Sequence, residues 1–378
     1  MRLPVPPYLV RRLVIAPLVW ALGVWLLLFT FPVGLLVLVL VSFALPPWLK
    51  PLRVIGFFVV YLACELVGLT VLLLTWIASG FGWKIRSPFF VRLHYGLLRG
   101  LLETLWVFGR RMFSLQIVRA GDMDMDDLDG DGEHDARPRL VLSRHAGPGD
   151  SFLLVREILS WTGRRPRIVL KSTLRLDPLI DTLLSRLPMA FIDTDHPEGA
   201  TEAIAELSRT MGPDDALLIF PEGGNFTEGR RTARIERLRS TGHEAAADRA
   251  EALRRVLAPR PGGVRQVLLE QPGADVVVVA HTGLEDLDSL GAIWKAIPVQ
   301  KTLYVGWQHW LASSLPTDVD ALSDWLFDRW EDVDDWIRRM DAMTGHGRLG
   351  WNDVPPFHEL TPANAPGRVG RRRGSPRR

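Results

Sequence analysis

Two long apolar stretches stand out in the N-terminal part of the chain. Residues Leu13–Leu45 contain no charged side chain, and Val54–Ser79 contain only one, Glu65. A membrane-spanning helix needs about 20 apolar residues, so Val54–Ser79 predicts one span directly. The first stretch is too long for one span, and Phe31–Gly34 in its middle carries a proline and a glycine, which weaken a helix. It predicts either one long kinked helix or two short re-entrant halves.

The residues around these stretches bear on membrane topology. The first stretch exceeds the apolar core of a signal peptide, and no cleavage site of small residues precedes Pro46-Pro47. We therefore expect residues 1–85 to form a retained anchor, integral to the cell membrane, with hydrophobic segments at 13–45 and 54–79. Basic residues outside both segments favour a two-helix hairpin whose outer flanks are cytoplasmic. Glu65 is either functional or a protonated or helix-paired structural carboxylate.

A third, amphipathic segment follows the anchor. Phe89–Phe113 mixes apolar residues with charged and histidine side chains at helical spacing. Residues 86–120 therefore predict either an interfacial helix or the first helix of a globular domain. Next, residues 121–137 are acidic and resemble the start of a calcium loop, but Pro138 occupies the position where such a loop needs its last acidic ligand. We interpret 121–137 as a solvated linker.

From Arg139 onwards, short apolar strands alternate with amphipathic helices. The pattern predicts strands at 139–143, 167–171, 189–192, 216–220 and 275–280, and helices at 151–161, 178–186, 200–211, 241–257 and 316–343. Thr317 is the predicted N-cap of the last helix, which carries Trp325, Trp330 and Trp336. This alternation is typical of an α/β domain with a mainly parallel sheet flanked by helices. We place that domain at 138–345, behind an N-terminal transmembrane helical anchor, and expect a disordered basic tail at 346–378.

Composition excludes several classes of protein. The chain has 378 residues, of which 45 are Lys or Arg and 43 are Asp or Glu, so its formal net charge is +2. A dedicated nucleic-acid binder usually has a strongly basic domain, so no nucleic-acid partner is expected. Cys64 is the single cysteine, which excludes a disulfide scaffold. Its place in an apolar segment also argues against thiol catalysis.

Strong catalytic motifs are missing from the sequence. It contains no G-x-S-x-G elbow, no phosphate-binding P-loop, no dinucleotide fingerprint and no H-E-x-x-H metal motif. What remains is a histidine five residues before an aspartate, a pairing in which the carboxylate orients an imidazole that removes a proton. This spacing occurs three times, as His145/Asp150, His243/Asp248 and His281/Asp286.

Local context separates the three pairs. His243 lies in a charged helical segment and is expected at the surface, whereas His145 and His281 both follow apolar strands, where α/β proteins place their sites. Only His145 is followed by Gly147–Gly149, which permit a tight turn and a close approach of substrate to the backbone. Asp150 then opens a helix, as an N-cap alone or also as the partner of His145. We therefore rank His145 above His281.

A second group of candidate residues follows the strand at 216–220. It consists of Pro221, Glu222, Gly223 and Gly224. Proline and two glycines at the end of a strand expose backbone N–H groups that can hold an anion or an oxyanion. Glu222 can hydrogen-bond the hydroxyl of an acceptor, and the alternative is a simple turn with a capping glutamate.

Taken together and in this order, these groups resemble the glycerolipid acyltransferases typified by 1-acyl-sn-glycerol-3-phosphate acyltransferase. That family carries an H-x-x-x-x-D block, an F-I-D-R-like block and an F-P-E-G-T-R block, which correspond here to His145–Asp150, Phe191–Thr194 and Phe220–Asn225. Two further stretches, Leu257–Gly263 and Pro316–Asp332, resemble the lysocardiolipin/lysophosphatidylinositol acyltransferase-like branch of the family. The resemblance covers Arg139–Arg339.

The resemblance implies a role for each group. His145 would be the general base that deprotonates an acceptor hydroxyl, which then attacks the thioester of acyl-CoA or acyl carrier protein, and Asp150 would orient His145. The acyl donor is a co-substrate, and neither a metal nor another cofactor is implied. The loop from Pro221 to Gly224 would help to place the acceptor. Lys171 and Arg175 are candidate anion contacts, and the alternative for Arg175 is a solvated cation.

The sequence departs from the family's blocks at four positions. Thr194 replaces the arginine of the second block, and Gly224-Asn225 replaces the Thr-Arg of the third. The family's arginines are thought to contact the phosphate of the acceptor. Arg230 and Arg231 are candidate substitutes. Arg144 replaces the usual asparagine before the histidine.

The leading hypothesis is therefore a membrane-bound O-acyltransferase that acts on a lysophospholipid such as 1-acyl-sn-glycerol-3-phosphate. Its partners would be a lipid acceptor, an acyl donor and the membrane, with the catalytic domain on the cytoplasmic face; no oligomeric state is predicted. A CoA-independent lipid transacylase or hydrolase that uses the same His/Asp pair is the second hypothesis. A non-enzymatic membrane lipid-binding protein is the third, because Thr194 and Asn225 stand where the family has arginine.

Overall fold

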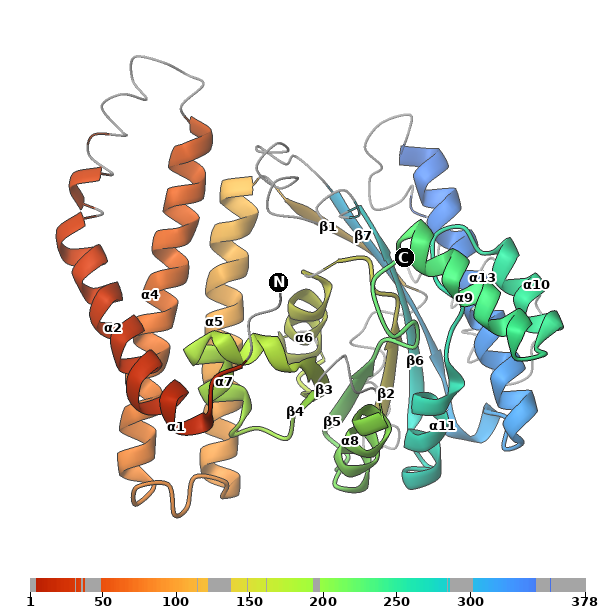
Figure 1. The fold of residues 1–378 in the computed structure, drawn as a ribbon, viewed down its shortest axis with the longest axis horizontal. Coiled ribbons are helices and arrows are strands. Elements are labelled where there is room, and N and C mark those ends of the chain that lie inside the picture. Colours follow the sequence, from red (N-terminus) through yellow and green to blue (C-terminus); the bar gives the residue numbers. More distant parts are fainter. Residues whose placement is uncertain are drawn as a thin grey trace, which may run out of the picture. The chain divides into compact units, whose positions relative to one another are not determined.

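The computed structural model describes residues 5–30, 32–34, 37, 49–113, 115–121, 137–147, 149–160, 162–192, 198–283, 285, 302–344 and 354. They belong to two compact units, whose helices and strands are labelled in Figure 1. The first unit comprises Met1–Gln116, Ser151–Ala203 and Asp286–Thr302. The second comprises Ile117–Asp150, Ile204–Glu285 and Leu303–Arg378.

The first unit is mainly helical. Its helices are α1 (Tyr8–Val10), α2 (Ala16–Trp25), α4 (Leu49–Ala78), α5 (Pro88–Phe113), α6 (Asp150–Ser160) and α7 (Pro178–Leu184), with wider π-helical turns at Arg11–Ile15 and Leu26–Thr30. A short parallel pair of strands, β3 (Arg165–Lys171) and β4 (Ala190–Ile192), aligns Leu170 with Phe191. A 3-10 helix at Ser172–Leu176 follows β3 and leads to α7.

Two described helices are long and apolar enough to cross a membrane. They are Tyr8–Gly34 and Leu52–Ala78, and α4 contains the second of them. Their length and composition support membrane association, whereas integral insertion and orientation stay predictions. The segment at 13–45 was predicted to be either one kinked helix or two halves. Residues 31, 35–36 and 38–45 of this segment lie outside the described residues, so both alternatives stay predictions.

The middle of α4 carries polar side chains that contact the start of α7. Glu65 is 3% exposed, and its Oε1 accepts a hydrogen bond from the backbone N–H of Leu179 at 3.1 Å. Asp177 caps the same helix by accepting from Ile180 N at 2.8 Å, and the Tyr61 hydroxyl donates to the other carboxylate oxygen of Asp177. The N–H groups at the start of a helix need such acceptors. These contacts favour the helix-paired structural role for Glu65.

A buried ion pair joins the N-terminal helix to α7. Arg11 is 7% exposed and its Nε lies 3.0 Å from Oδ2 of Asp181, which is 1% exposed. The Arg12 Nη2 lies 3.3 Å from the same oxygen and also donates to the Asp181 carbonyl at 2.9 Å. A buried charge is tolerated when it is paired and hydrogen-bonded. Asp181 therefore neutralises two arginines at the start of the chain.

Replacing Asp181 with alanine is expected to destabilise the first unit strongly, because it leaves two arginines without their anion. Breaking a buried pair costs about 3–5 kcal/mol of unfolding free energy. The measurement is the midpoint of thermal unfolding of the full chain in detergent micelles. Asp248→Ala, at a carboxylate whose side chain is 74% exposed, is the control and should unfold like the wild type. Equal midpoints for the two variants would contradict a structural role for the pair.

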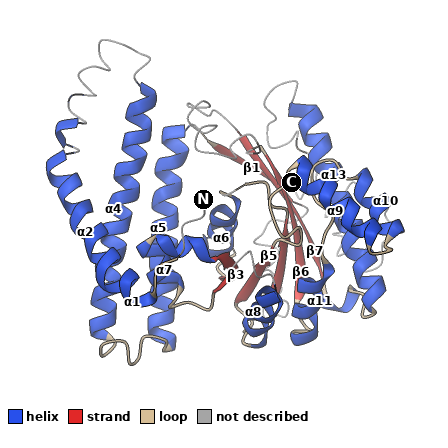
Figure 2. Ribbon diagram, in the orientation of Figure 1, coloured by secondary structure: helices blue, strands red, loops and turns tan. Residues whose placement is uncertain are grey.

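The second unit contains the larger part of the sheet. Its strands are β1 (Gln116–Gly121), β2 (Arg139–Ser143), β5 (Asp215–Ile219), β6 (Asp275–Thr282) and β7 (Thr302–Trp310). Its helices are α9 (Glu228–Ser240), α10 (Glu244–Ala252), α11 (Pro261–Glu270) and α13 (Val319–Thr344), and α8 (Glu198–Arg209) runs from the first unit into it. In Figure 2 the strands of this unit are flanked by helices.

The seven described strands form a mixed sheet in the order β1-β7-β6-β2-β5-β3-β4. Strand β2 is parallel to both of its neighbours, with Leu140 opposite Leu217 of β5 and Val276 of β6. Strand β7 is antiparallel to β6, with Val278 opposite Gln308. All residues of β2, β5 and β6 are buried, as expected for continuous apolar runs covered on both faces. The predicted α/β class, with a sheet flanked by helices, is confirmed.

Two predicted helix boundaries were wrong. The helix predicted at 241–257 is shorter in the structure, where α10 spans Glu244–Ala252, and an unpredicted helix, α9, ends just before it at Ser240. Gly242 between the two has φ +78°, a left-handed conformation that interrupts a helix. Asp318, and not Thr317, caps α13: its Oδ1 accepts from the backbone N–H of Asp320 and of Ala321, both at 3.0 Å.

The tryptophans predicted along the last helix are buried in α13, which packs on β6; they are Trp325, Trp330 and Trp336. The pattern missed β1, β7, α9 and α11. Most of the predicted linker, residues 122–136, and the tail except Val354 lie outside the described residues.

Candidate functional site

The candidate site lies at one edge of the sheet in the second unit. Strands β2, β5 and β6 run parallel and end at Ser143, Ile219 and Thr282. Loops that follow the carboxyl ends of parallel strands meet at the same edge, which is where α/β proteins bind their ligands. His145 follows β2, and the loop 220–227 follows β5. The structure therefore brings the two predicted groups of residues together.

His145 is held on both sides by the loop after β5. Its backbone N–H donates to Oε1 of Glu222 at 3.1 Å, and its carbonyl accepts from Phe226 N at 3.0 Å. The imidazole stacks on the ring of Phe220 with 4.6 Å between ring centroids and an interplanar angle of 28°. The side chain is half-buried. These contacts fix both the backbone and the plane of the imidazole, as a preorganised general base requires.

Glu222 is the residue that connects the loop to its surroundings. It is 1% exposed, and its Oε2 accepts from Leu257 N at 3.0 Å while its Oε1 accepts from His145 N. Both carboxylate oxygens therefore serve backbone amides of other segments. This geometry supports an indirect role, the positioning of His145, and direct hydrogen bonding of Glu222 to an acceptor stays a prediction.

Asp150 is the first residue of α6, as predicted. Its side chain lies outside the described residues, so its pairing with His145 stays a prediction. Among the residues that the structure describes, no group of three His, Cys, Asp or Glu side chains is placed to hold a metal ion.

A buried ion pair lies next to the site. Arg144 is 1% exposed, and its Nη1 donates to the His281 carbonyl at 3.0 Å and to Oε1 of Glu285 at 2.9 Å. Burial by itself would raise the pKa of Glu285, but Arg144 and the amide of Gly283 outweigh it and lower that pKa. His281 is 2% exposed, and its Nε2 lies 3.2 Å from the Arg144 carbonyl. Arg144 and His281 therefore hold the backbone that precedes His145 in place. Because His281 is buried in this structural contact, the geometry supports ranking His145 above His281.

Two exposed arginines approach the turn after β5, Arg230 from α9 and Arg260 from the residue before α11. Gly223 has φ +68°, and a Cβ there would lie 3.2 Å from Nη1 of Arg260. A Cβ on Gly224 would lie 3.4 Å from Nη1 of Arg230, which also donates to the Asn225 carbonyl at 3.0 Å and to the Asn225 side chain. Glycine thus lets two guanidinium groups approach the turn closely. Arg230 occupies the neighbourhood of the residues that replace the family's Thr-Arg.

Two other arginines hold the same region in place. Arg234 donates to the carbonyls of Ala258 and Glu222, both at 2.9 Å, and burial together with nearby Arg260 lowers its pKa to about 10. Arg231 donates to the Leu253 carbonyl at 2.8 Å and to the Glu251 carbonyl at 2.7 Å. Its guanidinium therefore serves the end of α10, and anion binding by Arg231 stays a prediction.

Sequence reasoning missed Arg234 and Arg260 as parts of this site. Arg260 donates its backbone N–H to the Pro221 carbonyl at 2.9 Å, and burial, followed by repulsion from Arg237, lowers its side-chain pKa. The sequence did contain a signal for this contact. Arg260 lies in the stretch Leu257–Gly263, which is part of the resemblance to the acyltransferase branch but to which no role was assigned. Arg234 lies within α9, a helix that the pattern did not predict.

The remaining candidates lie in the first unit. Lys171 is the exposed last residue of β3, and the Arg175 guanidinium lies 4.4 Å from the centroid of the Phe191 ring. Both therefore stay candidate anion contacts, described only within their own unit. Asp193 and Thr194, from the second family block, lie outside the described residues.

Residues 130–282 match the family model described as Acyltransferase. The chain thus carries an acyltransferase domain, and the match includes His145, Asp150 and the loop 220–227. This agrees with the resemblance to glycerolipid acyltransferases and supports acyl transfer as the chemistry of the domain. The resemblance to the lysocardiolipin/lysophosphatidylinositol branch stays a prediction. No curated protein matches the chain.

Proposed function

We propose that the chain is a membrane-bound O-acyltransferase, which transfers a fatty acyl group from acyl-CoA or acyl carrier protein to the hydroxyl of a lysophospholipid. The observation that carries this proposal is the held imidazole of His145 beside a turn that Arg230 and Arg260 approach. The two apolar helices support action at a membrane, where such acceptors reside. The proposal places the catalytic domain on the cytoplasmic face of the cell membrane.

In the proposed reaction His145 accepts the proton of the acceptor hydroxyl. The resulting oxygen attacks the thioester carbonyl carbon and forms a tetrahedral intermediate, whose collapse breaks the C–S bond. The leaving thiolate takes the proton from His145, which restores the neutral imidazole. Asp150 stabilises the imidazolium between these steps. Glu222 positions His145 by holding its backbone, and the loop from Pro221 to Gly224 helps to place the acceptor.

The acceptor in this proposal carries a phosphate, as 1-acyl-sn-glycerol-3-phosphate does. Arg230 and Arg260 lie beside Gly224 and Gly223 and present planar guanidinium groups, which suit phosphate oxygens. They take the place of the arginine that Asn225 replaces. Lys171, Arg175 and Arg231 are further candidate contacts to the acceptor or to the phosphates of the donor.

Arg230→Gln is expected to raise the KM for 1-acyl-sn-glycerol-3-phosphate about tenfold while changing kcat little. A hydrogen bond to a charged group contributes about 1.5–3 kcal/mol, and 1.4 kcal/mol corresponds to tenfold in affinity. The assay compares this acceptor with a monoacylglycerol, with acyl-CoA and acyl carrier protein as donors. The KM for monoacylglycerol should not change.

Arg239→Gln is the matched control, because Arg239 lies in the same helix α9 and is 47% exposed. It should leave both KM values unchanged. If Arg230→Gln and Arg239→Gln behave alike, Arg230 does not bind the acceptor phosphate. If the wild type acylates only monoacylglycerol, the acceptor is not phosphorylated. Acyl transfer from a phospholipid in the absence of both thioester donors would indicate a transacylase.

A further inference from the structure

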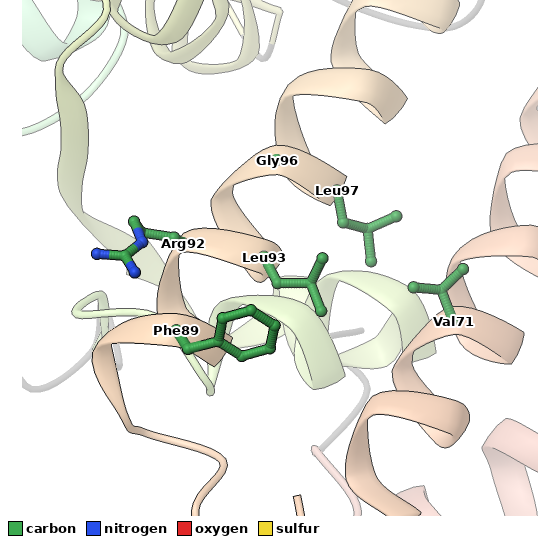
Figure 3. Close-up of a pocket in the computed structure, with 6 residues that line it drawn as sticks. All are labelled: Val71, Phe89, Arg92, Leu93, Gly96 and Leu97. Carbon is green, nitrogen blue, oxygen red and sulfur yellow. The ribbon is translucent and has the colours of Figure 1, made fainter. Parts of the chain in front are cut away.

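An open groove of about 520 Å³ lies between α4 and α5 in the first unit, and none of its lining residues is assigned to acyl transfer. Its lining residues are Val71 on α4 and Phe89, Arg92, Leu93, Gly96 and Leu97 on α5. Figure 3 shows Leu93 and Leu97 pointing from α5 toward Val71, while the Arg92 side chain extends away from Val71. The groove therefore has apolar walls and one cation at its edge.

The shape of the groove follows from residue spacing on α5. Phe89, Leu93 and Leu97 lie four residues apart and form one row along the helix, whereas Arg92 and Gly96 form the neighbouring row. A Cβ placed on Gly96 would meet no atom within 4 Å, so the missing side chain leaves space that nothing else fills. Phe89 and Leu93 are 62% and 42% exposed. This apolar surface is open to the surrounding medium.

The turn between α4 and α5 has the composition of a membrane interface. Phe81 and Trp83 are 69% and 83% exposed, and the Lys84 ammonium lies 5.1 Å from the Trp83 ring. Exposed aromatic rings with adjacent lysine or arginine are typical of the level of lipid headgroups. Along α4, Val67, Leu73 and Leu74 are all more than half exposed. This side of the first unit therefore has the composition of a lipid-facing surface, with Trp83 at the level expected for headgroups.

Arg92 lies on the first turns of α5, close in sequence to this aromatic turn. It forms no ion pair or hydrogen bond with any residue that the structure describes, and its side chain is exposed. A guanidinium at headgroup level attracts phosphate, and anionic lipids are attracted more strongly than zwitterionic ones. Lys84 and Arg86 in the preceding turn add to the positive charge of Arg92.

We propose that this groove binds an anionic phospholipid of the membrane, with one acyl chain along Leu93, Gly96 and Leu97 and the phosphate held by Arg92. Such a lipid covers apolar surface that α4 and α5 leave open, and it would join the two helices at the level of the headgroups. This site shares no residue with the proposed acceptor site at Arg230, so the proposal does not rest on the proposed catalytic function.

The test uses the full chain in lipid nanodiscs that contain phosphatidylglycerol with a diazirine in one acyl chain. After irradiation, adducts are mapped by peptide mass spectrometry. We expect adducts concentrated at 89–97 and around Val71, and we expect unlabelled phosphatidylglycerol to compete better than phosphatidylcholine with the same chains. Gly96→Leu fills the groove and should largely remove these adducts. Arg92→Gln should weaken competition by phosphatidylglycerol about tenfold.

Each variant has a matched control on the same helix. Gly100→Leu adds the same side chain at another glycine whose Cβ would meet nothing within 4 Å and which does not line the groove, and Arg99→Gln removes an exposed charge outside it. Both should label like the wild type, and unchanged thermal unfolding would show that all four variants fold. Labelling spread evenly over α4 and α5, or equal losses in Gly96→Leu and Gly100→Leu, would overturn the proposed site. Equal competition by phosphatidylcholine would overturn its anionic specificity.

Discussion

Replacing His145 with alanine is expected to lower kcat for acyl transfer by about 10²–10⁴-fold, the usual contribution of a general base. The reason is geometric: backbone bonds to Glu222 and Phe226 and stacking on Phe220 hold this imidazole at the sheet edge where the acyltransferase domain has its loops. The measurement is the initial rate of acyl transfer by the purified full chain. The expression level and the midpoint of thermal unfolding of the variant are compared with those of the wild type.

The sequence supplies a control for this experiment. His243 has the same spacing to an aspartate, yet it lies exposed before α10 and its Nδ1 is 2.9 Å from the Thr241 hydroxyl. His243→Ala should leave kcat and KM unchanged. A His145→Ala protein that turns over as fast as His243→Ala would remove His145 from the mechanism. Loss of turnover with an unchanged thermal midpoint would separate chemistry from folding.

Glu222→Ala is expected to reduce stability and activity together. It leaves the backbone N–H groups of His145 and Leu257 without their acceptor, and each buried unsatisfied donor costs about 1–3 kcal/mol, hence about 2–6 kcal/mol in all. A displacement of His145 by about 1 Å would add a loss of about 10²-fold in kcat. Thermal unfolding and initial rates measure the two effects.

Glu222→Gln distinguishes the charge of this side chain from its two hydrogen bonds. The amide keeps one oxygen, but its NH₂ group faces a second N–H donor, so the variant should fall between wild type and Glu222→Ala in both measurements. Glu236→Ala, at an exposed position of α9, is the control and should match the wild type. Full activity and stability of Glu222→Gln would contradict the bridging role and would favour a simple turn.

The central strands β2, β5 and β6 were predictable because they are mainly apolar runs. Segments such as 139–143 and 275–280 are buried on both faces, and an apolar run without alternation is the pattern that such burial produces. Strand β7 was missed because Thr302–Trp310 mixes polar and aromatic residues and pairs antiparallel at one side of β6. The break at Gly242 was missed because the prediction placed this glycine inside the helix at 241–257, where an isolated glycine is tolerated.

The candidate site was predictable where chemistry lies in one short segment. His145 and the loop from Pro221 to Gly224 each follow a strand, and parallel strands bring such segments to one edge. Contacts between segments far apart in the chain were not predictable. The approach of Arg260 to Gly223 depends on the path of the chain after α10, and the bond from Glu222 to Leu257 depends on the same path. No local sequence pattern encodes how closely such distant segments approach one another.

The ion pair between Arg11 and Asp181 has a consequence for the order in which the protein folds. The partners are 170 residues apart, so at a synthesis rate of 5–20 residues per second Asp181 emerges roughly 10–30 s after Arg11. During that interval the N-terminal helices contain arginines that cannot be buried without their anion. We therefore expect these helices to reach their final packing only after α7 has left the ribosome. The final packing of the N-terminal helices and the folding of the first unit are in this respect one late, coupled event.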